Sequence, residues 1–378
     1  MKSPICEKLG IEFPLFAFSH CRDVVAAVSK AGGFGVLGAV GHTPETLEVE
    51  LSWIDAHCDG KPYGVDLIVP TSMADQSGSM TPEELAARVP EAHKRYVERI
   101  LAEHGIPTHD LWDRQIAANF GDNLRASGAS AQLDTAFKHP IKLVVNALGV
   151  PPPFMMEGAR KHGVLVGALA GSKQHAIKHA EMGLDVVIAA GGEAGGHCGE
   201  IATMVLVPEV VHALKNYPNI AVLGAGGIVT GRQMAACMAM GAQGVWTGSV
   251  WLTTQEAETH PVIKEKMLTA GSNQTVRSRS RTGKYTRQLR SPWTDAWQAE
   301  DAPDPLPMPL QGLVSGPALT KIDRLALAGD AGAKQLATYW VGQGVGLMNE
   351  SLAARTVVKD FMTDFADACE RLSGFMND

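Results

Sequence analysis

The sequence predicts an α/β protein built on a (β/α)8 TIM barrel. Three observations lead to this fold class: short apolar segments recur along the chain, helix-like segments follow them, and the connections between them are brief. Such strand–helix–strand repeats form right-handed units of a parallel sheet, and eight units close into a barrel. The eight expected strands begin at Pro14, Phe34, Tyr63, Ile141, Val164, Val186, Ile220 and Gly244.

The first part of the chain already shows the alternation. Its three strands are expected at Pro14–Ser19, Phe34–Ala39 and Tyr63–Val69. Helices are expected at Asp23–Lys30 and at Pro44–His57, where the Thr43 hydroxyl can cap the first turn.

The alternation stops between residues 71 and 138, which are richer in charge and contain no convincing strand. Thr81 and Pro82 are expected to begin a helix that runs to about His104. We expect this segment to be a helical insertion after the third strand. It would serve as a lid or an oligomer contact and carry no chemistry.

The alternation resumes at Ile141. The remaining strands are expected at Ile141–Leu148, Val164–Leu169, Val186–Ala190, Ile220–Gly224 and Gly244–Thr247, and helices at Pro153–His162, Ser172–Met182 and Gly231–Met240. Pro208 and Glu209 are expected to begin a further helix that runs to about Asn216, since proline is favoured in a first helical turn.

The chain therefore divides into three parts. Residues 1–70 and 139–270 form the barrel, residues 71–138 the insertion, and residues 271–378 an extension packed on the barrel. Within the extension we expect a solvated or phosphate-facing basic loop (Arg277–Arg290), an extended proline-rich connector (Ala302–Leu310) and a C-terminal helix (Asn349–Leu372).

Composition excludes several classes of protein. The net charge of −7 over 378 residues argues against nucleic-acid binding, which needs a basic surface. No apolar run approaches the roughly 20 residues of a membrane span. Six scattered cysteines without a CxxC pair suit a reducing compartment, and no histidine spacing suggests a metal site. We expect a cytoplasmic protein with a small-molecule substrate, no membrane or nucleic-acid partner and no metal.

A glycine-rich turn with one histidine follows the strand Val186–Ala190. The glycines of this turn are Gly191, Gly192, Gly195 and Gly196, and His197 comes directly after them. A lone histidine is usually a hydrogen-bonded core residue, but this one stands at the C-terminal end of a barrel strand, where active sites lie. His197 is therefore the catalytic candidate. Glu193 is expected to support the turn, and Cys198, though beside an imidazole, is not expected to act as a nucleophile.

A second pair of turns follows the last two strands. Gly226, Gly227 and Gly248 allow close backbone approach, and Ser249 adds a hydroxyl donor. In barrels these two loops commonly bind phosphate through backbone N–H groups. A dinucleotide fingerprint is the weaker reading, because Val229 stands where GxGxxG needs its third glycine. A phosphate-bearing cofactor is therefore favoured over plain tight turns.

Four motifs together resemble the nitronate monooxygenase family, formerly called 2-nitropropane dioxygenases. They are AGGFGVLGA (31–39), EAGGHCGE (193–200), GAGGIVTGRQMAACMAMGAQGVWTGS (224–249) and YWVGQGVGL (339–347). The resemblance covers most of the chain outside residues 71–138. It implies an FMN-dependent (β/α)8 enzyme, and it extends to a sister branch, the FMN-dependent enoyl-acyl-carrier-protein reductases.

The resemblance also assigns roles by position. It implies that the FMN phosphate is bound at Ala225, Gly226, Gly227, Gly248 and Ser249, and that the flavin ring is contacted at Ala17, Phe18, Ser19, Gly191, Gly195 and Gly196. It places His197 over the reactive face of the flavin and His20 nearby as a second candidate. Asp66 stands where the family normally has Asn, and an ionised carboxylate cannot donate a hydrogen bond to a flavin carbonyl.

The implied reaction is oxidation of an alkyl nitronate, or of a nitroalkane, by O₂ to a carbonyl compound and nitrite. His197 would deprotonate the substrate or orient its anion. The alternative on the same scaffold is NAD(P)H-dependent reduction of an enoyl thioester. A third hypothesis is a flavin-binding accessory protein without turnover, and a homodimer is the family-typical assembly.

Overall fold

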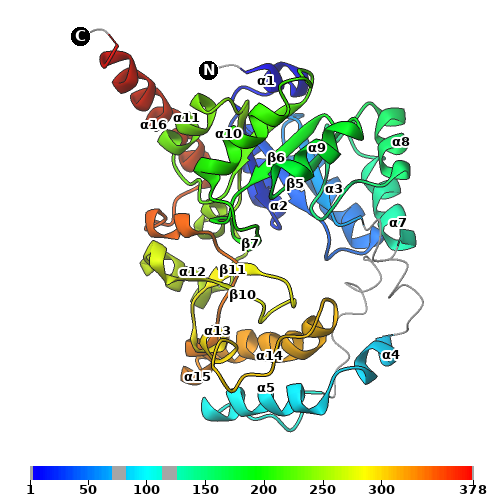
Figure 1. Cartoon of the computed structure of the whole chain (residues 1–378), viewed down its shortest axis with the longest axis vertical. Coiled ribbons are helices and arrows are strands. Elements are labelled where there is room, and N and C mark those ends of the chain that lie inside the picture. The colour runs from blue at the N-terminus through cyan, green and yellow to red at the C-terminus, as the bar shows by residue number, and fades with distance from the viewer. Residues whose placement is uncertain (1–2, 70–81, 113–125, 377–378) are drawn as a thin grey trace.

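The computed structural model describes residues 3–69, 82–112 and 126–376, and it confirms the predicted barrel (Figure 1). Eight parallel strands pair in chain order, and the last pairs with the first, so the sheet is closed. The barrel strands are β1 (Leu15–Ser19), β2 (Phe34–Gly38), β3 (Tyr63–Leu67), β4 (Leu143–Asn146), β5 (Leu165–Ala170), β6 (Val186–Ala190), β8 (Ala221–Ala225) and β9 (Gly244–Thr247). All eight expected strands are therefore present.

Strand alternation divides the apolar side chains between two cores. One set points into the barrel, where Phe16 lies 5.2 Å from Phe34 between ring centroids, and Leu143, Ile188 and Leu223 join the same cluster. The other set points outward against the surrounding helices. The short helix α1 (Pro4–Leu9), which the sequence did not predict, adds its buried residues to the inner cluster and so closes the N-terminal end of the barrel.

Helices surround the barrel on its outside. They are α2 (Arg22–Lys30), α3 (Pro44–His57), α7 (Ala126–Ala136), α8 (Pro153–His162), α9 (Lys173–Glu181), α10 (Thr203–Ala213) and α11 (Gly231–Ala239). The Thr43 hydroxyl caps α3 as expected, accepting a hydrogen bond from the Thr46 backbone N–H. The expected start of α10 at Pro208 was wrong, because this helix begins five residues earlier and encloses the proline.

A second layer lies opposite the C-terminal ends of the strands (Figure 1). It comprises α4 (Pro82–Ala87), α5 (Glu91–Glu103), α12 (Pro261–Thr269), α13 (Pro292–Ala296), α14 (Leu310–Leu327), α15 (Ala331–Leu336) and the 3₁₀ turns η3 (Ser272–Gln274) and η4 (Gln343–Leu347), whereas the 3₁₀ turn η2 (Ser249–Thr253) directly follows β9 on the barrel. The helix expected from Thr81 to His104 is two helices separated at Pro90, where proline lacks the N–H that a continuous helix needs. Thr81 itself lies outside the described residues.

The insertion and the C-terminal part of the chain share this layer. The Tyr96 ring of α5 packs edge-on against Trp297, with centroids 5.2 Å apart, and Arg99 donates to the Asp301 carboxylate at 2.8 Å. Val97, Ile100 and Leu101 of α5 are buried in the cluster that also contains α14 residues. Helices α4 and α5 of the insertion are thus anchored to the extension, whereas α7, which also lies within residues 71–138, packs against α3 and α8 on the barrel.

The basic segment expected as a loop is mostly a β-hairpin. Strands β10 (Thr275–Ser278) and β11 (Thr286–Leu289) pair antiparallel, and β11 also pairs with the two-residue strand β7 (Gly196–His197). The alternation in this segment is of polar and basic residues, so it lacked the apolar pattern that predicts strands. This hairpin ties the second layer to the turn after β6.

The end of the chain returns to the barrel. The connector between α13 and α14 contains turns and residues without regular secondary structure, and the C-terminal helix α16 (Ala354–Gly374) packs against α11 and α2. Among the described helices, none combines the length and apolar character that crossing a bilayer requires.

Candidate active site

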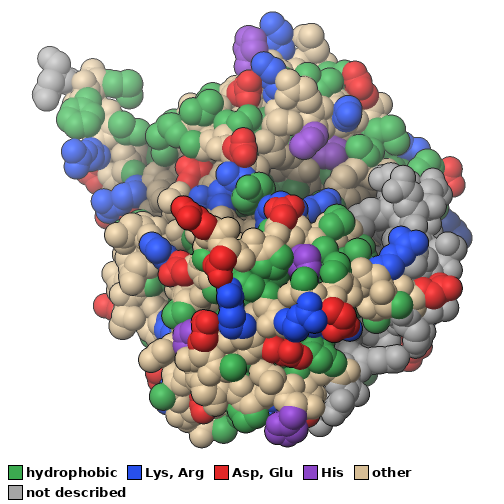
Figure 2. Space-filling view, turned by 60° about the horizontal axis from the view of Figure 1, so that its bottom comes forward, with side chains coloured by type: hydrophobic (Ala, Val, Ile, Leu, Met, Phe, Trp, Pro, Cys, Tyr) green, Lys and Arg blue, Asp and Glu red, His purple; other side chains and the backbone are tan. Residues whose placement is uncertain are grey.

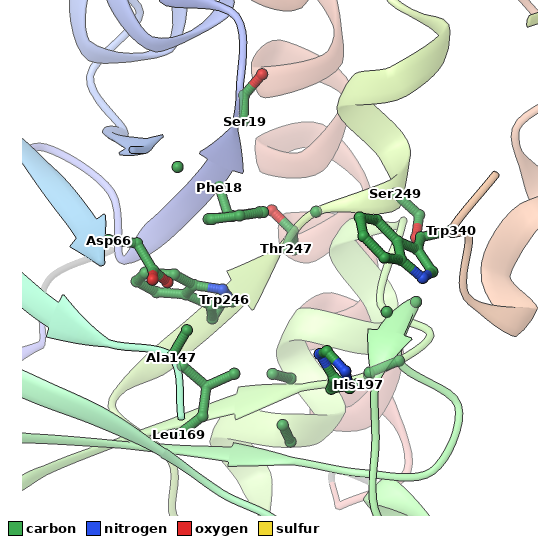
Figure 3. Close-up of a pocket in the computed structure, with 18 of the residues that line it drawn as sticks. Phe18, Ser19, Asp66, Ala147, Leu169, His197, Trp246, Thr247, Ser249 and Trp340 are labelled. Carbon is green, nitrogen blue, oxygen red and sulfur yellow. The ribbon is translucent and has the colours of Figure 1, made fainter. Parts of the chain in front are cut away.

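A cavity of about 270 Å³ opens at the C-terminal end of the barrel, facing the second layer (Figure 3). Its wall is mainly apolar and receives residues from the ends of the barrel strands, together with Thr282, Tyr339 and Trp340 from the second layer. In the space-filling view a furrow with charged side chains on its rim runs between the two bodies of the molecule (Figure 2). Barrel enzymes place their active sites at this end of the strands.

The end of β1 contributes Phe18 and Ser19 to this cavity. Phe18 lines it, and its ring stacks on that of Trp246 from β9 with centroids 6.1 Å apart. Ala17 points the opposite way, into the core beneath α2, so its side chain is not part of the wall. The Ser19 hydroxyl accepts a hydrogen bond from the Cys21 backbone N–H at 3.1 Å and points away from the centre of the cavity (Figure 3).

His197 lies on the opposite side of the cavity from Asp66 (Figure 3). Its backbone is fixed by the pairing of β7 with β11, and its Nε2 atom lies 3.0 Å from the Thr282 hydroxyl. The Nδ1 atom has no partner among the described residues. Burial, together with the positive charge of Lys284, lowers the pKa of His197 to about 4. The imidazole is therefore neutral near pH 7, with Nδ1 left available to a ligand.

The glycines before His197 allow the chain to pass closely against other backbone segments. A Cβ atom on Gly195 would lie 2.8 Å from the Gly342 nitrogen, and one on Gly191 would lie 2.2 Å from the Thr203 hydroxyl. Gly195 and Gly196 line the cavity, whereas Gly191 does not and is packed instead against the start of α10. These glycines are therefore needed in part because other segments of the protein pack closely against them, and not only because they line the cavity.

Glu193 supports this turn, as the sequence suggested. Its carboxylate accepts hydrogen bonds from the backbone N–H and the hydroxyl of Thr203, at 2.8 and 2.9 Å, in the first turn of α10. Its carbonyl oxygen accepts a third bond from the Gln343 backbone N–H at 2.9 Å. The carboxylate of Glu193 is therefore occupied by hydrogen bonds that hold the turn, and it is not free for proton transfer.

The turns after β8 and β9 form one side of the cavity. Gly226 and Gly227 adopt φ values of 111° and 69°, which only glycine takes up readily, and Ala225, Gly248 and Ser249 complete this wall. The backbone N–H groups of Gly227, Gly248 and Ser249 meet no acceptor in the described part of the chain. The Ser249 hydroxyl accepts from the Gly342 N–H at 2.8 Å and keeps its own hydrogen for donation. This group of donors fits an anion such as phosphate.

Asp66 and His20 also line the cavity. Asp66, at the end of β3, is 5% exposed, and burial raises its pKa well above the ordinary value. The His20 ring is open to the cavity, and its Nδ1 donates to the Gly38 carbonyl at 2.9 Å, since a carbonyl can only accept. Because protein atoms surround the rest of the ring, the pKa of His20 is lowered. The lowered pKa favours the neutral form of His20, and the raised pKa favours the protonated form of Asp66.

Several residues of the cavity wall were not singled out by sequence reasoning, among them Trp246, Thr282, Tyr339 and Trp340. Trp246 follows from the alternation along β9, which points it into the barrel. The Tyr339–Trp340 pair stands at the start of the YWVGQGVGL motif, which was noted without a role. Thr282 carried no signal, because its position depends on a hairpin that brings it to a residue 85 positions away.

One group outside the cavity has metal-ligand chemistry. Potential ligand atoms of Cys21, Asp23 and Glu258 lie within 4.8 Å of one another, and it is the one such group in the described ranges. Cys21 already donates to the Glu256 carbonyl at 3.1 Å, and burial raises its thiol pKa, which favours the thiol over the metal-binding thiolate. The group does not line the active-site cavity.

Comparison with known proteins agrees with this geometry. The family model described as nitronate monooxygenase matches residues 2–364. The chain is 52% identical over all of both chains to the Mycobacterium tuberculosis protein Rv1533, whose name calls it a monooxygenase. It is 26% identical to a protein of Staphylococcus aureus (strain MSSA476) named as a nitronate monooxygenase, over 96% of each chain.

Two solved structures share the fold over nearly the whole length. The nitroalkane oxidase of Streptomyces ansochromogenes superposes with a TM-score of 0.78 at 24% identity, covering 97% of this chain and 99% of that one. FabK from Thermotoga maritima superposes with a TM-score of 0.73 at 26% identity, covering 99% of both. The barrel and the second layer are therefore shared, not peculiar to this chain.

Proposed function

Because the chain belongs to the nitronate monooxygenase family and is a flavin-dependent oxidoreductase, we propose that it oxidises alkyl nitronates with O₂, using FMN. The products are a carbonyl compound and nitrite. The observation that carries this proposal is His197, which lines an apolar cavity with an unpartnered Nδ1 atom, while the turns after β8 and β9 line the same cavity with N–H groups that have no acceptor among the described residues.

The choice of FMN rests on the turns after β8 and β9. Their free N–H groups at Gly227, Gly248 and Ser249, with the Ser249 hydroxyl, would hold the terminal phosphate of FMN. The cavity enclosed by Phe18, Trp246 and the turn 194–196 would hold the flat apolar ring. A bound flavin supplies a two-electron acceptor, which amino-acid side chains do not provide.

His197 is suited to binding the substrate as a hydrogen-bonding group. A residue whose pKa is about 4 is neutral at pH 7, so the imidazole does not itself carry a cation for the nitronate anion. The positive charge is supplied next to it by Lys284, an exposed residue two positions after Thr282 with no ion pair within the described ranges. We infer that His197 Nδ1 orients the substrate, and that Lys284 attracts its charge.

The low pKa of His197 also affects the second role considered for it, which is to remove a proton from the substrate. A base whose conjugate acid has a pKa of about 4 is weak, and proton abstraction is most efficient when the pKa lies near the working pH. A preformed nitronate needs no proton removed, so it suits this imidazole better than a neutral nitroalkane does. The apolar wall formed by Phe18, Leu169 and Trp246 matches an alkyl chain.

The reaction breaks the carbon–nitrogen bond of the nitronate, releases the nitrogen as nitrite and puts an oxygen atom from O₂ on the carbon, so that two nitronates and one O₂ give two carbonyl compounds and two nitrite ions. O₂ is the final electron acceptor. The residues of this chain contribute by binding and orientation, and by a cavity wall that is largely apolar and limits access of water to the reacting atoms.

Reduction of an enoyl thioester with NAD(P)H is the second candidate. It is favoured by the likeness to FabK and by the fold shared with the enoyl reductase domain of MlnA from Bacillus amyloliquefaciens, which superposes with a TM-score of 0.66 at 15% identity. In this function the longer acyl chain would lie in the furrow between the two bodies of the molecule (Figure 2).

An anaerobic absorbance titration of the purified protein separates these candidates. We expect the oxidised flavin spectrum at the start and bleaching when an alkyl nitronate is added without NAD(P)H. The His197→Ala variant should bleach at least about tenfold more slowly, since it loses the orienting contact. His175→Ala is the matched control, because His175 is an exposed histidine on α9, away from the cavity.

Other results would point elsewhere. If the flavin bleaches only with NAD(P)H and regains colour with an enoyl thioester, the reductase function replaces the proposed one. A flavoprotein that responds to neither reagent would favour an accessory role without turnover. Absence of any bound flavin would contradict all of these functions.

A further inference from the structure

Asp66 is a buried acidic residue whose carboxyl group has no ion-pair partner in the described part of the chain. It lies at the end of β3, its side chain lines the cavity and it is 5% exposed. Its carbonyl oxygen accepts the Ala39 N–H, but the carboxyl group has no hydrogen-bond or ion-pair partner in the described part of the chain. Burying an unpaired carboxylate is so costly that such a group normally keeps its proton.

The surroundings of Asp66 offer no cation. On β2 its pairing partner is Gly38, whose carbonyl is occupied by His20, and on β4 its partner is Val145. Asn146, next along β4, is a neutral amide already bonded to the backbone of Val69. The remaining titratable residues on the cavity wall are His20, His197 and Tyr339, and His197 lies across the cavity (Figure 3).

We propose that Asp66 contacts the bound flavin as a neutral carboxylic acid, donating its proton to an acceptor atom of the ring, and that ionisation of this group weakens flavin binding. The proposal rests on the proposed use of FMN. A neutral carboxyl group donates one hydrogen bond, as a side-chain amide does, so an Asp can take the position of an Asn provided that it stays protonated. Burial of Asp66 raises its pKa and thereby favours the protonated form.

The expected consequence is a cofactor affinity that falls as the pH rises. If only the protonated form binds, the Kd for FMN increases by about tenfold per pH unit above the pKa of the carboxyl group in the flavin-free protein. The ionisation of the FMN phosphate also changes with pH, but it does so equally for every variant of the protein.

The test measures the FMN Kd, by quenching of flavin fluorescence, between about pH 6 and about pH 9.5, a range that covers a strongly raised carboxyl pKa. Asp66→Asn keeps a donor that cannot ionise, so its Kd should stay nearly constant where that of the wild type rises. Asp66→Leu has no donor, and its Kd should be about tenfold higher than that of Asp66→Asn throughout, as for one lost hydrogen bond.

Several results would overturn the proposal. They are equal affinities for Asp66→Leu and Asp66→Asn, the same alkaline rise in Asp66→Asn as in the wild type, a flat wild-type profile, or a wild-type affinity that improves with rising pH. Should the variants fail to fold, calorimetry of the wild type in two buffers of different ionisation enthalpy gives the answer. Uptake approaching one proton per FMN at alkaline pH supports the proposal, and no uptake contradicts it.

These outcomes are distinct from failure of the proposed function. A protein that binds no FMN contradicts both. A protein that binds FMN and is bleached by nitronate, but whose Asp66 variants match the wild type at every pH, contradicts only the role given to Asp66.

Discussion

The Nε2 atom of His197 lies 3.0 Å from the hydroxyl oxygen of Thr282, although 85 residues separate them in the sequence. This contact joins the turn after β6 to the tip of the β10–β11 hairpin, and so joins the barrel to the second layer. It fixes one nitrogen of the imidazole and leaves the other without a partner among the described residues. The orientation of the candidate catalytic residue thus depends on a residue outside the barrel.

Thr282→Ala removes that contact while leaving His197 in place. We expect nitronate-dependent bleaching of the flavin to slow by about two- to tenfold, the value of one ordinary hydrogen bond, because the imidazole is then free to rotate. Stopped-flow absorbance under anaerobic conditions measures this rate.

Thr282→Ser is the matched control, since it keeps the hydroxyl and loses only a methyl group. Its rate should stay close to that of the wild type. If the Ala and Ser variants were slowed equally, the hydroxyl would not be what orients His197.

The barrel could be predicted because its signals are local. The strands Val186–Ala190 and Gly244–Thr247 have the expected bounds, since each is a short apolar run between polar or glycine residues. The free donors after β8 and β9 follow from glycines that stand at fixed positions behind those strands. Features that depend only on a strand and the turn after it can therefore be predicted from the sequence.

The rest depends on contacts between distant segments. The start of α10 was misplaced because its first turn is held by Glu193, ten residues upstream and across a turn, and not by a neighbouring cap. Strand β11 exists because it pairs with β7 and with β10. No periodic pattern within a segment reports a partner elsewhere, so the hairpin and Thr282 could not be found in advance.

The lowered pKa of His197 predicts a pH dependence of stability. In the unfolded chain a histidine titrates near 6.5, whereas in the folded protein this one titrates at about 4. Between these values protonation favours the unfolded state, so the stabilisation is fully present above about pH 6.5 and is lost as the pH falls toward about 4. Between about pH 7 and about pH 5 the loss attributable to His197 is about 2 kcal/mol.

Urea unfolding of the flavin-loaded protein, followed by tryptophan fluorescence, measures this loss. His197→Gln cannot be protonated, so the variant should lose less stability than the wild type on the same change of pH. His20 and His179, whose pKa values burial also lowers, are present in both proteins and cancel in the difference. Parallel losses in the two proteins would show that His197 is not held neutral.

Lys284 should affect the binding of an anionic substrate more than the chemical step. It is exposed, has no ion pair within the described ranges and lies close enough to His197 to lower its pKa. Lys284→Met removes this charge while keeping the length of the side chain. We expect kcat/KM for an alkyl nitronate at low salt to fall by about two- to fivefold, as is usual for one exposed charge acting on an anion.

Two comparisons test whether charge is the cause. Lys284→Arg should keep most of the wild-type kcat/KM, because it retains the positive charge. Raising the ionic strength should bring the wild type and Lys284→Met together, since salt screens interactions between exposed charges. A deficit of Lys284→Met that persisted in high salt, or that Lys284→Arg shared, would instead assign Lys284 a role in shaping the hairpin beside Thr282.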